Sequence, residues 1–207
     1  MKRHLFSFCL VLAGLVLVLN LCIQAEEAIV GKPAPNFSQK DLKGQTHSLA
    51  NYKGKIIVLE WLNHDCPYVR KHYNSGNMQK LQKTYTKKGI VWLSVISSAP
   101  GKQGYCTPEE ASKLTKTKNA NPTAVLLDPE GIVGKKYGAK TTPQMFIINA
   151  EGILVYNGGI DDKPSAKVED IEKARNLVQL ALDELLAGKE VTVKTSRPYG
   201  CSVKYSN

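Results

Sequence analysis

The sequence lacks several patterns that mark whole classes of protein. Its 207 residues contain no internal repeat and no low-complexity tract, so a repeat array is excluded. Aromatic residues make up only 7% of the chain and are not interleaved with a basic stripe, although lysine and arginine outnumber acidic residues by 28 to 18. We therefore expect a solvated basic surface and no nucleic-acid partner. The apolar residues, 43% of the total, suffice for one domain with a continuous core.

Cysteine is also scarce. Of the five cysteines, Cys9 and Cys22 lie near the N-terminus, and the rest of the chain has only Cys66, Cys106 and Cys201. Three thiols leave at least one unpaired in a monomer, which excludes a framework built only of internal disulfides. In an oxidising compartment a spare thiol is a liability unless it is buried, used or cycling.

The N-terminal segment has the pattern of an export signal. Lys2 and Arg3 precede an apolar run over residues 5–19, and a cleavage position follows Ala25. We predict that residues 1–25 are a signal peptide and that the mature protein is exported, in a bacterial periplasm.

Two alternatives keep the N-terminus in the membrane. Residues 5–23 are long enough to stay there as an uncleaved anchor. Cys22 is a second possible anchor, through lipidation, although Asn20 and Leu21 precede it where small residues are usual. In each case the same domain lies outside the cytoplasm.

Alternating strand and helix patterns predict an α/β sheet. Near-continuous apolar runs rich in β-branched residues indicate strands buried on both faces, and helical patterns separate them. A strand, a helix and a second strand in this order form a right-handed parallel crossover. The predicted strands are Ile56–Leu62, Ile90–Ile96 and Thr123–Leu127, and the predicted helices follow Pro67, with a kink at Asn74–Asn77, and span Pro108 to about Lys118 behind a capping box.

The C-terminal half continues with a hairpin and a helix. Residues 141–148 are predicted as one strand, paired through a turn with residues 153–156. An amphipathic helix is predicted over residues 168–185, ended by Gly188. We expect one domain over residues 26–188 and a tail over residues 189–207, with a short strand at Val191–Val193 and with Cys201 near its end.

Cys66 is the first candidate for chemistry. It follows the first buried strand and precedes Pro67, which begins a helix. Sites in open α/β sheets lie at the carboxyl ends of strands, and the free N–H groups of a helix start stabilise a thiolate. Arg70, one turn later, adds positive charge that lowers a thiol pKa. The alternative is a buried, inert cysteine.

Thr142-Pro143 is the second candidate feature. At the start of a central strand this bond predicts a cis peptide beside the reactive sulfur, which leaves the backbone of Thr142 free to pair with a substrate chain. The alternative is an ordinary proline at the start of a strand.

These motifs together resemble the thioredoxin-like redoxin superfamily, which contains peroxiredoxins and exported thiol-disulfide proteins. The resemblance covers residues 31–186 and is carried by Gly31–Phe37, the Asn63–Val69 turn and Thr142-Pro143, with Gly200–Tyr205 as a further match to an exported peroxiredoxin-like branch. It implies a thioredoxin-like fold with a central mixed sheet flanked by helices. It also implies reduction of peroxides or protein disulfides by Cys66, an external thiol reductant and no cofactor.

Two departures from the superfamily limit the mechanism. Val69 stands where a dithiol oxidoreductase has its second cysteine, so a dithiol step within the loop is excluded. Leu59 and Asn63 stand where a typical peroxiredoxin has proline and threonine or serine, although Asn63 still offers a polar contact.

A second thiol must then resolve the oxidised Cys66. Cys201 and Cys106 are the candidates within the mature chain, with Cys201 slightly favoured, and an outside thiol is the third option. A structural Cys106–Cys201 disulfide is a further alternative that leaves Cys66 as the sole free thiol.

A non-catalytic role is the competing hypothesis, in which the same surface holds a peptide or a metal. His64, Cys66 and His72 are residue types that suit copper or zinc. We expect no metal site, because the exported copper-delivery relatives of this fold use two close cysteines. The sequence leaves the oligomeric state open.

Overall fold

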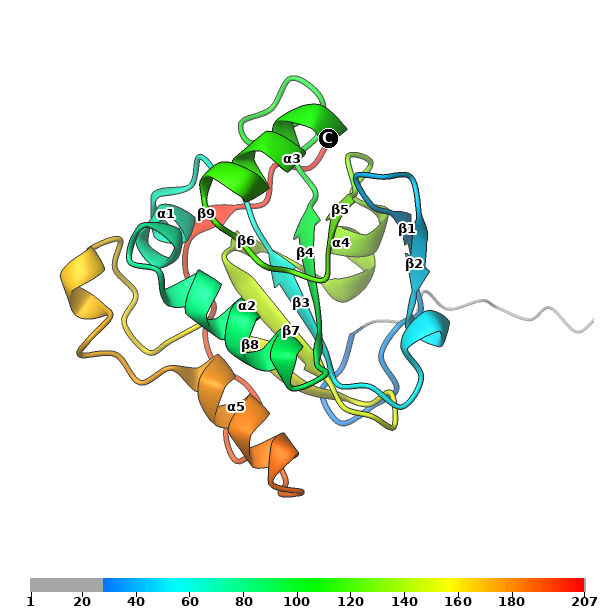
Figure 1. The fold of residues 1–207 in the computed structure, drawn as a ribbon, viewed down its shortest axis with the longest axis vertical. Helices are drawn as coiled ribbons and strands as arrows, with labels where there is room; N and C mark the ends of the chain where they lie inside the picture. The colour runs from blue at the N-terminus through cyan, green and yellow to red at the C-terminus, as the bar shows by residue number, and fades with distance from the viewer. Residues whose placement is uncertain (1–27, 207) are drawn as a thin grey trace, which may run out of the picture.

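The computed structural model of the protein describes residues 28–206, so the predicted signal peptide, with Cys9 and Cys22, lies outside the described residues. The core is a five-stranded sheet with the order β5-β4-β3-β7-β8 (Figure 1). Its strands are β3 (Ile57–Trp61), β4 (Val91–Ile96), β5 (Ala124–Leu127), β7 (Gln144–Ile148) and β8 (Leu154–Gly158). β3, β4 and β5 run parallel, whereas β7 and β8 are antiparallel to their neighbours. The predicted mixed sheet is confirmed.

The helices confirm most of the local predictions. The helix after Pro67 is split into α1 (Pro67–Asn74) and α2 (Asn77–Lys87), because Gly76 between them takes a left-handed conformation. Thr107 caps α3 (Pro108–Thr117) through the predicted capping box. The short helix α4 (Ile132–Tyr137) follows β5. In the described part of the chain no helix is long and apolar enough to cross a membrane.

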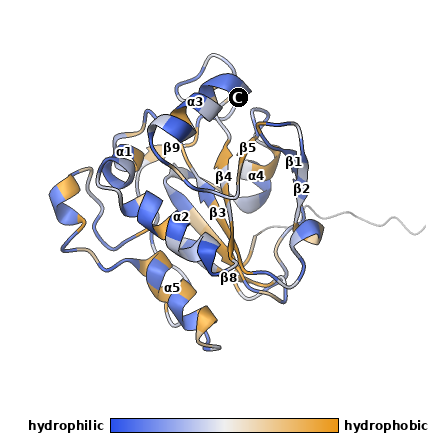
Figure 2. Ribbon diagram, viewed as in Figure 1, coloured by the Kyte–Doolittle hydropathy of each residue, from blue (hydrophilic) through white to orange (hydrophobic). Residues whose placement is uncertain are grey.

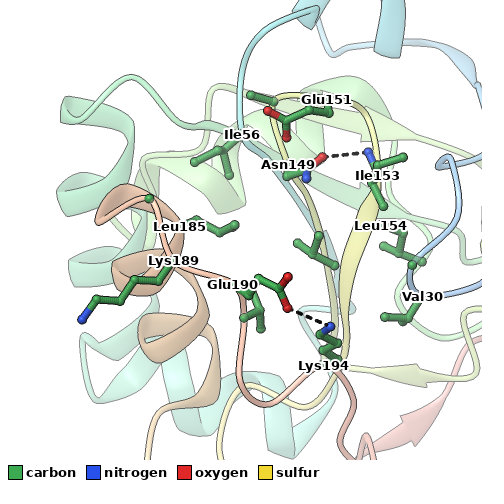
Figure 3. A pocket seen from close by; sticks show the side chains of 15 residues that line it. Val30, Ile56, Asn149, Glu151, Ile153, Leu154, Leu185, Lys189, Glu190 and Lys194 are labelled. Atoms are coloured by element: carbon green, nitrogen blue, oxygen red, sulfur yellow. Dashed lines mark hydrogen bonds and ion pairs between the residues drawn. The ribbon is translucent and has the colours of Figure 1, made fainter.

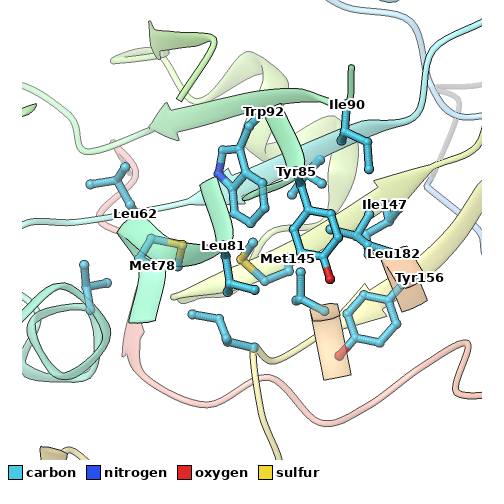
Figure 4. Packing of buried hydrophobic residues seen from close by; sticks show 14 of the residues in the cluster. Leu62, Met78, Leu81, Tyr85, Ile90, Trp92, Met145, Ile147, Tyr156 and Leu182 are labelled. Carbon is cyan, nitrogen blue, oxygen red and sulfur yellow. The ribbon is translucent and has the colours of Figure 1, made fainter. Parts of the chain in front are cut away.

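The sheet separates two apolar cores. On one face, α1, α2 and the last helix, α5 (Leu177–Leu186), pack against Val58, Trp92 and Ile147 (Figure 4). On the other face, α4 and the N-terminal segment pack against Leu59, Trp61 and neighbouring residues. In Figure 2 hydrophobic residues run along strands such as β4, whereas α2 is coloured mainly hydrophilic and α5 carries both kinds of residue. Every residue of β3 and β4 is buried, as expected for central strands covered on both faces.

Smaller elements complete the fold around this sheet. A hairpin of β1 (Ser38–Lys40) and β2 (Thr46–Ser48) and a 3-10 turn, η1 (Leu49–Tyr52), precede β3. Asp128 accepts hydrogen bonds from the N–H groups of Val133 and Gly134 and so holds the start of α4 beside β5.

The predicted helix over residues 168–185 is wrong in its first half. Val168–Asp170 form a 3-10 turn, η2, and the α-helix begins only at Leu177. Asn176 caps α5 by accepting a hydrogen bond from the N–H of Gln179. The N–H of Leu177 donates to the Ile160 carbonyl instead of continuing a helix. The helical spacing of apolar residues continues across residues 168–185, but the Asn176 cap and the hydrogen bond to Ile160 start the helix only at Leu177.

The tail also differs from its prediction. Val191–Val193 form no strand, because the Glu184 carboxylate accepts from both the N–H and the hydroxyl of Thr192. Nor are residues 141–148 one strand, since the chain breaks at Pro143. Before the break, β6 (Thr141–Thr142) pairs with β9 (Cys201–Ser202) of the tail. The tail therefore crosses the molecule, passes α1 and β6 at β9, and continues toward the C-terminus beside α3 (Figure 1).

Candidate active site

Cys66 lies where the fold converges. It connects the loop after β3 to α1, its backbone N–H donates to the Asn63 carbonyl at 3.1 Å, and its residue position is the N-cap of the helix. Pro67 occupies the first turn of α1 and supplies the helical φ. The side chain has no exposed surface. The backbone on both sides of Cys66 therefore fixes the position of its sulfur, and other parts of the chain bury it.

Two groups cover the sulfur of Cys66. Its Sγ lies 2.8 Å from the Sγ of Cys201 and 3.0 Å from the carbonyl oxygen of Thr142. All three cysteines of the described chain are free thiols. A disulfide bond is about 2.05 Å long, so the two sulfurs need to approach by only about 0.8 Å to bond.

The tail reaches Cys66 by strand pairing. Thr142 pairs with Cys201 and Thr141 with Ser202 in an antiparallel ladder. The Thr142-Pro143 peptide bond is cis, as predicted. The prediction that the Thr142 backbone is free for a substrate chain is wrong, because the protein's own tail occupies that edge.

Gly200 makes this close approach possible. Its φ is +145°, and a Cβ at this position would stand 2.0 Å from the carbonyl oxygen of Thr142. Only glycine allows the tail to lie so close to the backbone of β6.

The two thiols differ in acidity. Burial raises the pKa of Cys66, but hydrogen bonds from Cys201 and from the N–H of Val69 outweigh it, so the pKa is below its ordinary value. Burial, the hydrogen bond to Cys66 and the negative charge that Cys66 carries when ionised raise the pKa of Cys201 to about 11. Cys66 is therefore the more acidic of the two thiols, and when it ionises Cys201 is the thiol that donates to it.

Arg70 lies one turn after Cys66 in α1, and its charge acts on the neighbouring thiol, Cys201. Its side chain is exposed, and its charge, like that of Lys204, lowers the pKa of Cys201. The acidity of Cys66 instead depends on hydrogen bonds at the helix start and from the tail.

Cys106 lies away from this pair. Its buried thiol donates to the carbonyl of Gly104 at 3.4 Å, and burial raises its pKa to about 11. Together with His64 it lines a separate cavity of about 340 Å³ that Cys66 does not line. Within residues 28–206, Cys201 is the cysteine that contacts Cys66.

The Asn63 side chain forms two hydrogen bonds that hold the loop between β3 and α1. Its side-chain oxygen accepts from the N–H of Asp65, and its amide donates to the carbonyl of Gln103 at 3.2 Å. Only 1% of Asn63 is exposed. The predicted polar contact between Asn63 and a substrate stays a prediction, since each end of the amide has one partner within the protein and keeps further hydrogen-bonding capacity.

The two histidines near Cys66 do not converge on a metal. His72 has both ring nitrogens in hydrogen bonds, with Asn77 at 2.8 Å and Tyr199 at 3.2 Å. Burial lowers the pKa of His64, and that of His72, to about 4. Among the described residues, no group of three or more His, Cys, Asp and Glu side chains is arranged to hold a metal ion.

The sequence reasoning missed a buried polar cluster beneath the tail. Lys71 of α1 donates to Asp161 at 3.3 Å and to the hydroxyl of Tyr199 at 3.3 Å, and all three residues are buried. Tyr199 also donates to Asp161. The sequence did carry a signal for Tyr199, which lies two residues before Cys201. Residues two apart in an extended segment face the same side.

A second concavity lies at the other end of the sheet. A cavity of about 420 Å³ has an apolar floor that includes Ile56 and Leu185, with Glu151, Lys189 and Lys194 at its rim (Figure 3). None of the predicted site residues lines it. Cys66 and Cys201 lie at the opposite end of β3, where the chain enters α1.

Comparison with known proteins shows similarity to named thiol-disulfide oxidoreductases. The chain is 25% identical over 156 residues to the thiol-disulfide oxidoreductase ResA of Geobacillus thermodenitrificans. The aligned region covers 73% of this chain and 82% of the relative. The chain is 26% identical over 160 residues to the thiol:disulfide interchange protein DsbE of Escherichia coli, 71% of this chain and 74% of the relative.

A solved structure gives the same picture for the fold. An uncharacterised conserved protein from Geobacillus kaustophilus superposes with a TM-score of 0.73 at 26% identity, over 86% of this chain and 93% of the other. The model of the AhpC/TSA family matches residues 30–157, more than half of the chain. This chain therefore belongs to the AhpC/TSA family of thioredoxin-like redoxins.

Proposed function

We propose that the protein is an exported thiol-dependent oxidoreductase that reduces disulfide bonds, with Cys66 as nucleophile and Cys201 as resolving thiol. The observation that carries this proposal is the 2.8 Å separation of the two Sγ atoms. The activities named for ResA and DsbE, thiol-disulfide oxidoreduction and thiol:disulfide interchange, support a disulfide as the substrate.

The reaction needs two exchange steps. The Cys66 thiolate attacks one sulfur of the substrate disulfide, the substrate S–S bond breaks, and the other sulfur leaves as a thiolate that takes up a proton. Cys201 then loses its proton and attacks the Cys66 Sγ of the mixed disulfide, which releases the second substrate thiol. Two electrons pass to the substrate, the protein keeps a Cys66–Cys201 disulfide, and an external thiol reductant restores the dithiol.

The charges around Cys201 support this order. While Cys66 is a thiolate, its negative charge raises the pKa of Cys201 and keeps Cys201 protonated. Once Cys66 is in a mixed disulfide that charge is gone. The positive charges of Lys204 and Arg70, which lower the pKa of Cys201, then favour its thiolate. Cys201 becomes nucleophilic only after Cys66 has reacted.

A peroxide is the second candidate substrate, supported by the AhpC/TSA match and by the complete burial of Cys66, which favours a small oxidant. In that case the Cys66 thiolate attacks one peroxide oxygen, the O–O bond breaks, and the other oxygen takes up a proton and leaves as water or an alcohol. Cys66 becomes a sulfenic acid, and the Cys201 thiol condenses with it to form the disulfide and release water. The disulfide is preferred because the relatives ResA and DsbE are named for disulfide chemistry, and because Leu59 and Asn63 stand where a typical peroxiredoxin has proline and threonine or serine.

Disulfide mapping tests the proposal. The reduced mature protein is treated with one equivalent of oxidised glutathione or, separately, of hydrogen peroxide, and its peptides are mapped by non-reducing mass spectrometry. We expect a Cys66–Cys201 bond, kept in Cys106→Ser, and a Cys66–glutathione adduct that accumulates in Cys201→Ser. A Cys66–Cys106 bond, or a Cys66 that stays free while glutathione disulfide is present, contradicts the assignment of Cys201. The oxidant that reacts faster identifies the substrate class.

The alternative of a peptide- or metal-binding protein without turnover predicts a different result. A binder loses no thiols in stoichiometric amounts when an oxidant and an external dithiol are supplied together. Catalytic consumption of the dithiol that vanishes in Cys66→Ser supports the enzyme.

Export depends on residues 1–25, and N-terminal sequencing of the protein from an envelope fraction tests it. We expect a mature chain that begins at Glu26. An intact N-terminus in a membrane fraction identifies the anchored form instead.

A further inference from the structure

The tail that brings Cys201 to Cys66 occupies the place of an incoming chain. β6 has two residues, and its partner strand in the described structure is β9. A strand edge with free backbone groups binds an extended peptide by the same ladder of hydrogen bonds. A substrate chain and the tail therefore compete for Thr141 and Thr142. As long as the tail is in place, Cys66 has no exposed surface.

The tail is fastened through Tyr199, two residues before Cys201. The Tyr199 hydroxyl donates to a carboxylate oxygen of Asp161, and Lys71 donates to the other carboxylate oxygen and to the hydroxyl. Asp161 and Lys71 come from a loop and from α1, so the contact ties the tail to the helix that begins at Cys66. The Tyr199 ring also lies 5.9 Å from that of Tyr68 on α1.

The hydrogen-bond directions at Tyr199 are consistent with one another. His72 is neutral at physiological pH, since burial lowers its pKa to about 4. Its Nδ1 accepts from the side-chain amide of Asn77, so its Nε2 carries the proton and donates to Tyr199. The Tyr199 hydroxyl thus donates once and accepts twice, which uses its full hydrogen-bonding capacity.

We propose that Tyr199 is a latch: a positioning residue that holds the tail in the place of a substrate chain and keeps reduced Cys66 closed until the tail lifts. The part played by a substrate chain rests on the proposed function, whereas closure of Cys66 is a property of the reduced protein alone. Asp161, Lys71 and His72 form the buried cluster that binds the Tyr199 hydroxyl. Opening the latch frees the edge of β6 and exposes Cys66 in one movement.

Tyr199→Phe tests the latch with the smallest change. It removes the hydroxyl but keeps the ring against Tyr68, and it leaves Asp161 paired with Lys71. The matched control is Tyr105→Phe, since 42% of Tyr105 is exposed and it lies outside the tail. The readout is the rate at which N-ethylmaleimide alkylates Cys66 in the reduced protein, followed by peptide mass spectrometry on the plateau above the pKa of Cys66.

The alkylation rate reports the fraction of molecules with a lifted tail. A hydrogen bond to a charged group is lost in Tyr199→Phe, so the rate at Cys66 rises about tenfold to a hundredfold, and it does not change in Tyr105→Phe. A peptide that contains an internal disulfide is expected to form its mixed disulfide with Cys66 faster by a similar factor.

An unchanged Cys66 alkylation rate in both Tyr199→Phe and Tyr199→Ala overturns the latch. A fall in thermal midpoint without a change in that rate also overturns it, because Tyr199 then serves stability alone. Failure of the proposed function has a separate signature. In that case oxidised glutathione produces no Cys66–Cys201 bond in the wild-type protein, while the alkylation of Cys66 still responds to Tyr199→Phe.

Discussion

Replacing Gly200 by alanine tests whether the position of the tail controls the chemistry. The backbone at this residue has a φ of +145°, which side chains rarely adopt, and an added Cβ would stand 2.0 Å from the Thr142 carbonyl oxygen. Neither atom belongs to a flexible side chain, so the strand itself must move. The protein is expected to fold, because Gly200 itself belongs to neither of the two apolar cores.

The size of the effect follows from this contact. Carbon and oxygen atoms approach to about 3.3 Å even in favourable contacts, so the tail must shift by about 1 Å or more. A misplacement of about 1 Å at a reacting group costs about 100-fold in rate. Because the sulfurs of Cys66 and Cys201 are only 2.8 Å apart, we expect closure of their disulfide to slow by about 100-fold in Gly200→Ala.

The assay follows the formation of the Cys66–Cys201 bond after reduced protein is mixed with oxidised glutathione. Samples are quenched with acid, the remaining thiols are labelled with a maleimide, and the labels are counted by mass. Gly188→Ala is the matched control, since Gly188 also has a positive φ of +68° but open space around its Cβ position. A closure rate in Gly200→Ala within threefold of the Gly188→Ala rate would refute the reasoning.

Three further predictions concern acidity and stability. In Cys201→Ala the pKa of Cys66 rises, because a hydrogen bond that lowers it is lost, and the pH profile of Cys66 alkylation by iodoacetamide moves upward, with less movement in Cys201→Ser. Burial raises the pKa of Glu60, so the folded state holds its proton more tightly and the free energy of unfolding falls as pH rises above about 4.3. Urea unfolding across pH 4 to 8 is expected to show a shallower fall in Glu60→Gln, and an equally steep one contradicts this. Asp128→Ala leaves two N–H groups at the start of α4 unpaired, and we expect it to lower the free energy of unfolding by about 2 kcal/mol. Urea unfolding at pH 7 measures this change. A loss below about 0.5 kcal/mol excludes a role for Asp128 in holding the start of α4.

Local patterns predicted the parts of the fold that local physics controls. The strands β3 and β4 have continuous apolar runs that only a sheet covered on both faces can bury. The capping box at Thr107 satisfies helix N–H groups with neighbouring side chains, so its outcome needs no tertiary contact. The error at residues 168–176 has the opposite cause. There the apolar spacing is helical, but the carbonyl of Ile160, far along the chain, accepts the N–H that a continuing helix would use.

The features of the site also divide into those that local sequence predicts and those that depend on tertiary contacts. The sequence placed Cys66 at a strand end and helix start, and from neighbouring residues it predicted the cis bond at Pro143. It could not decide between Cys201 and Cys106 as the neighbour of Cys66, because 135 residues separate Cys66 from Cys201. Contacts over such a distance depend on which surfaces meet after the chain has folded, and no periodicity encodes them.

By itself the sequence determined the alternation of strands and helices, the place of Cys66 between a strand end and a helix start, and the absence of a second cysteine at Val69. Each of these is a local property, because periodicity, capping and spacing act within a few residues. Only the tertiary structure decided that the tail fills the edge of β6, that Tyr199 enters the buried Lys71–Asp161 pair and that Cys201 contacts Cys66. The physical reason is that these contacts join surfaces, each of which is complete only once the sheet and α1 have packed together.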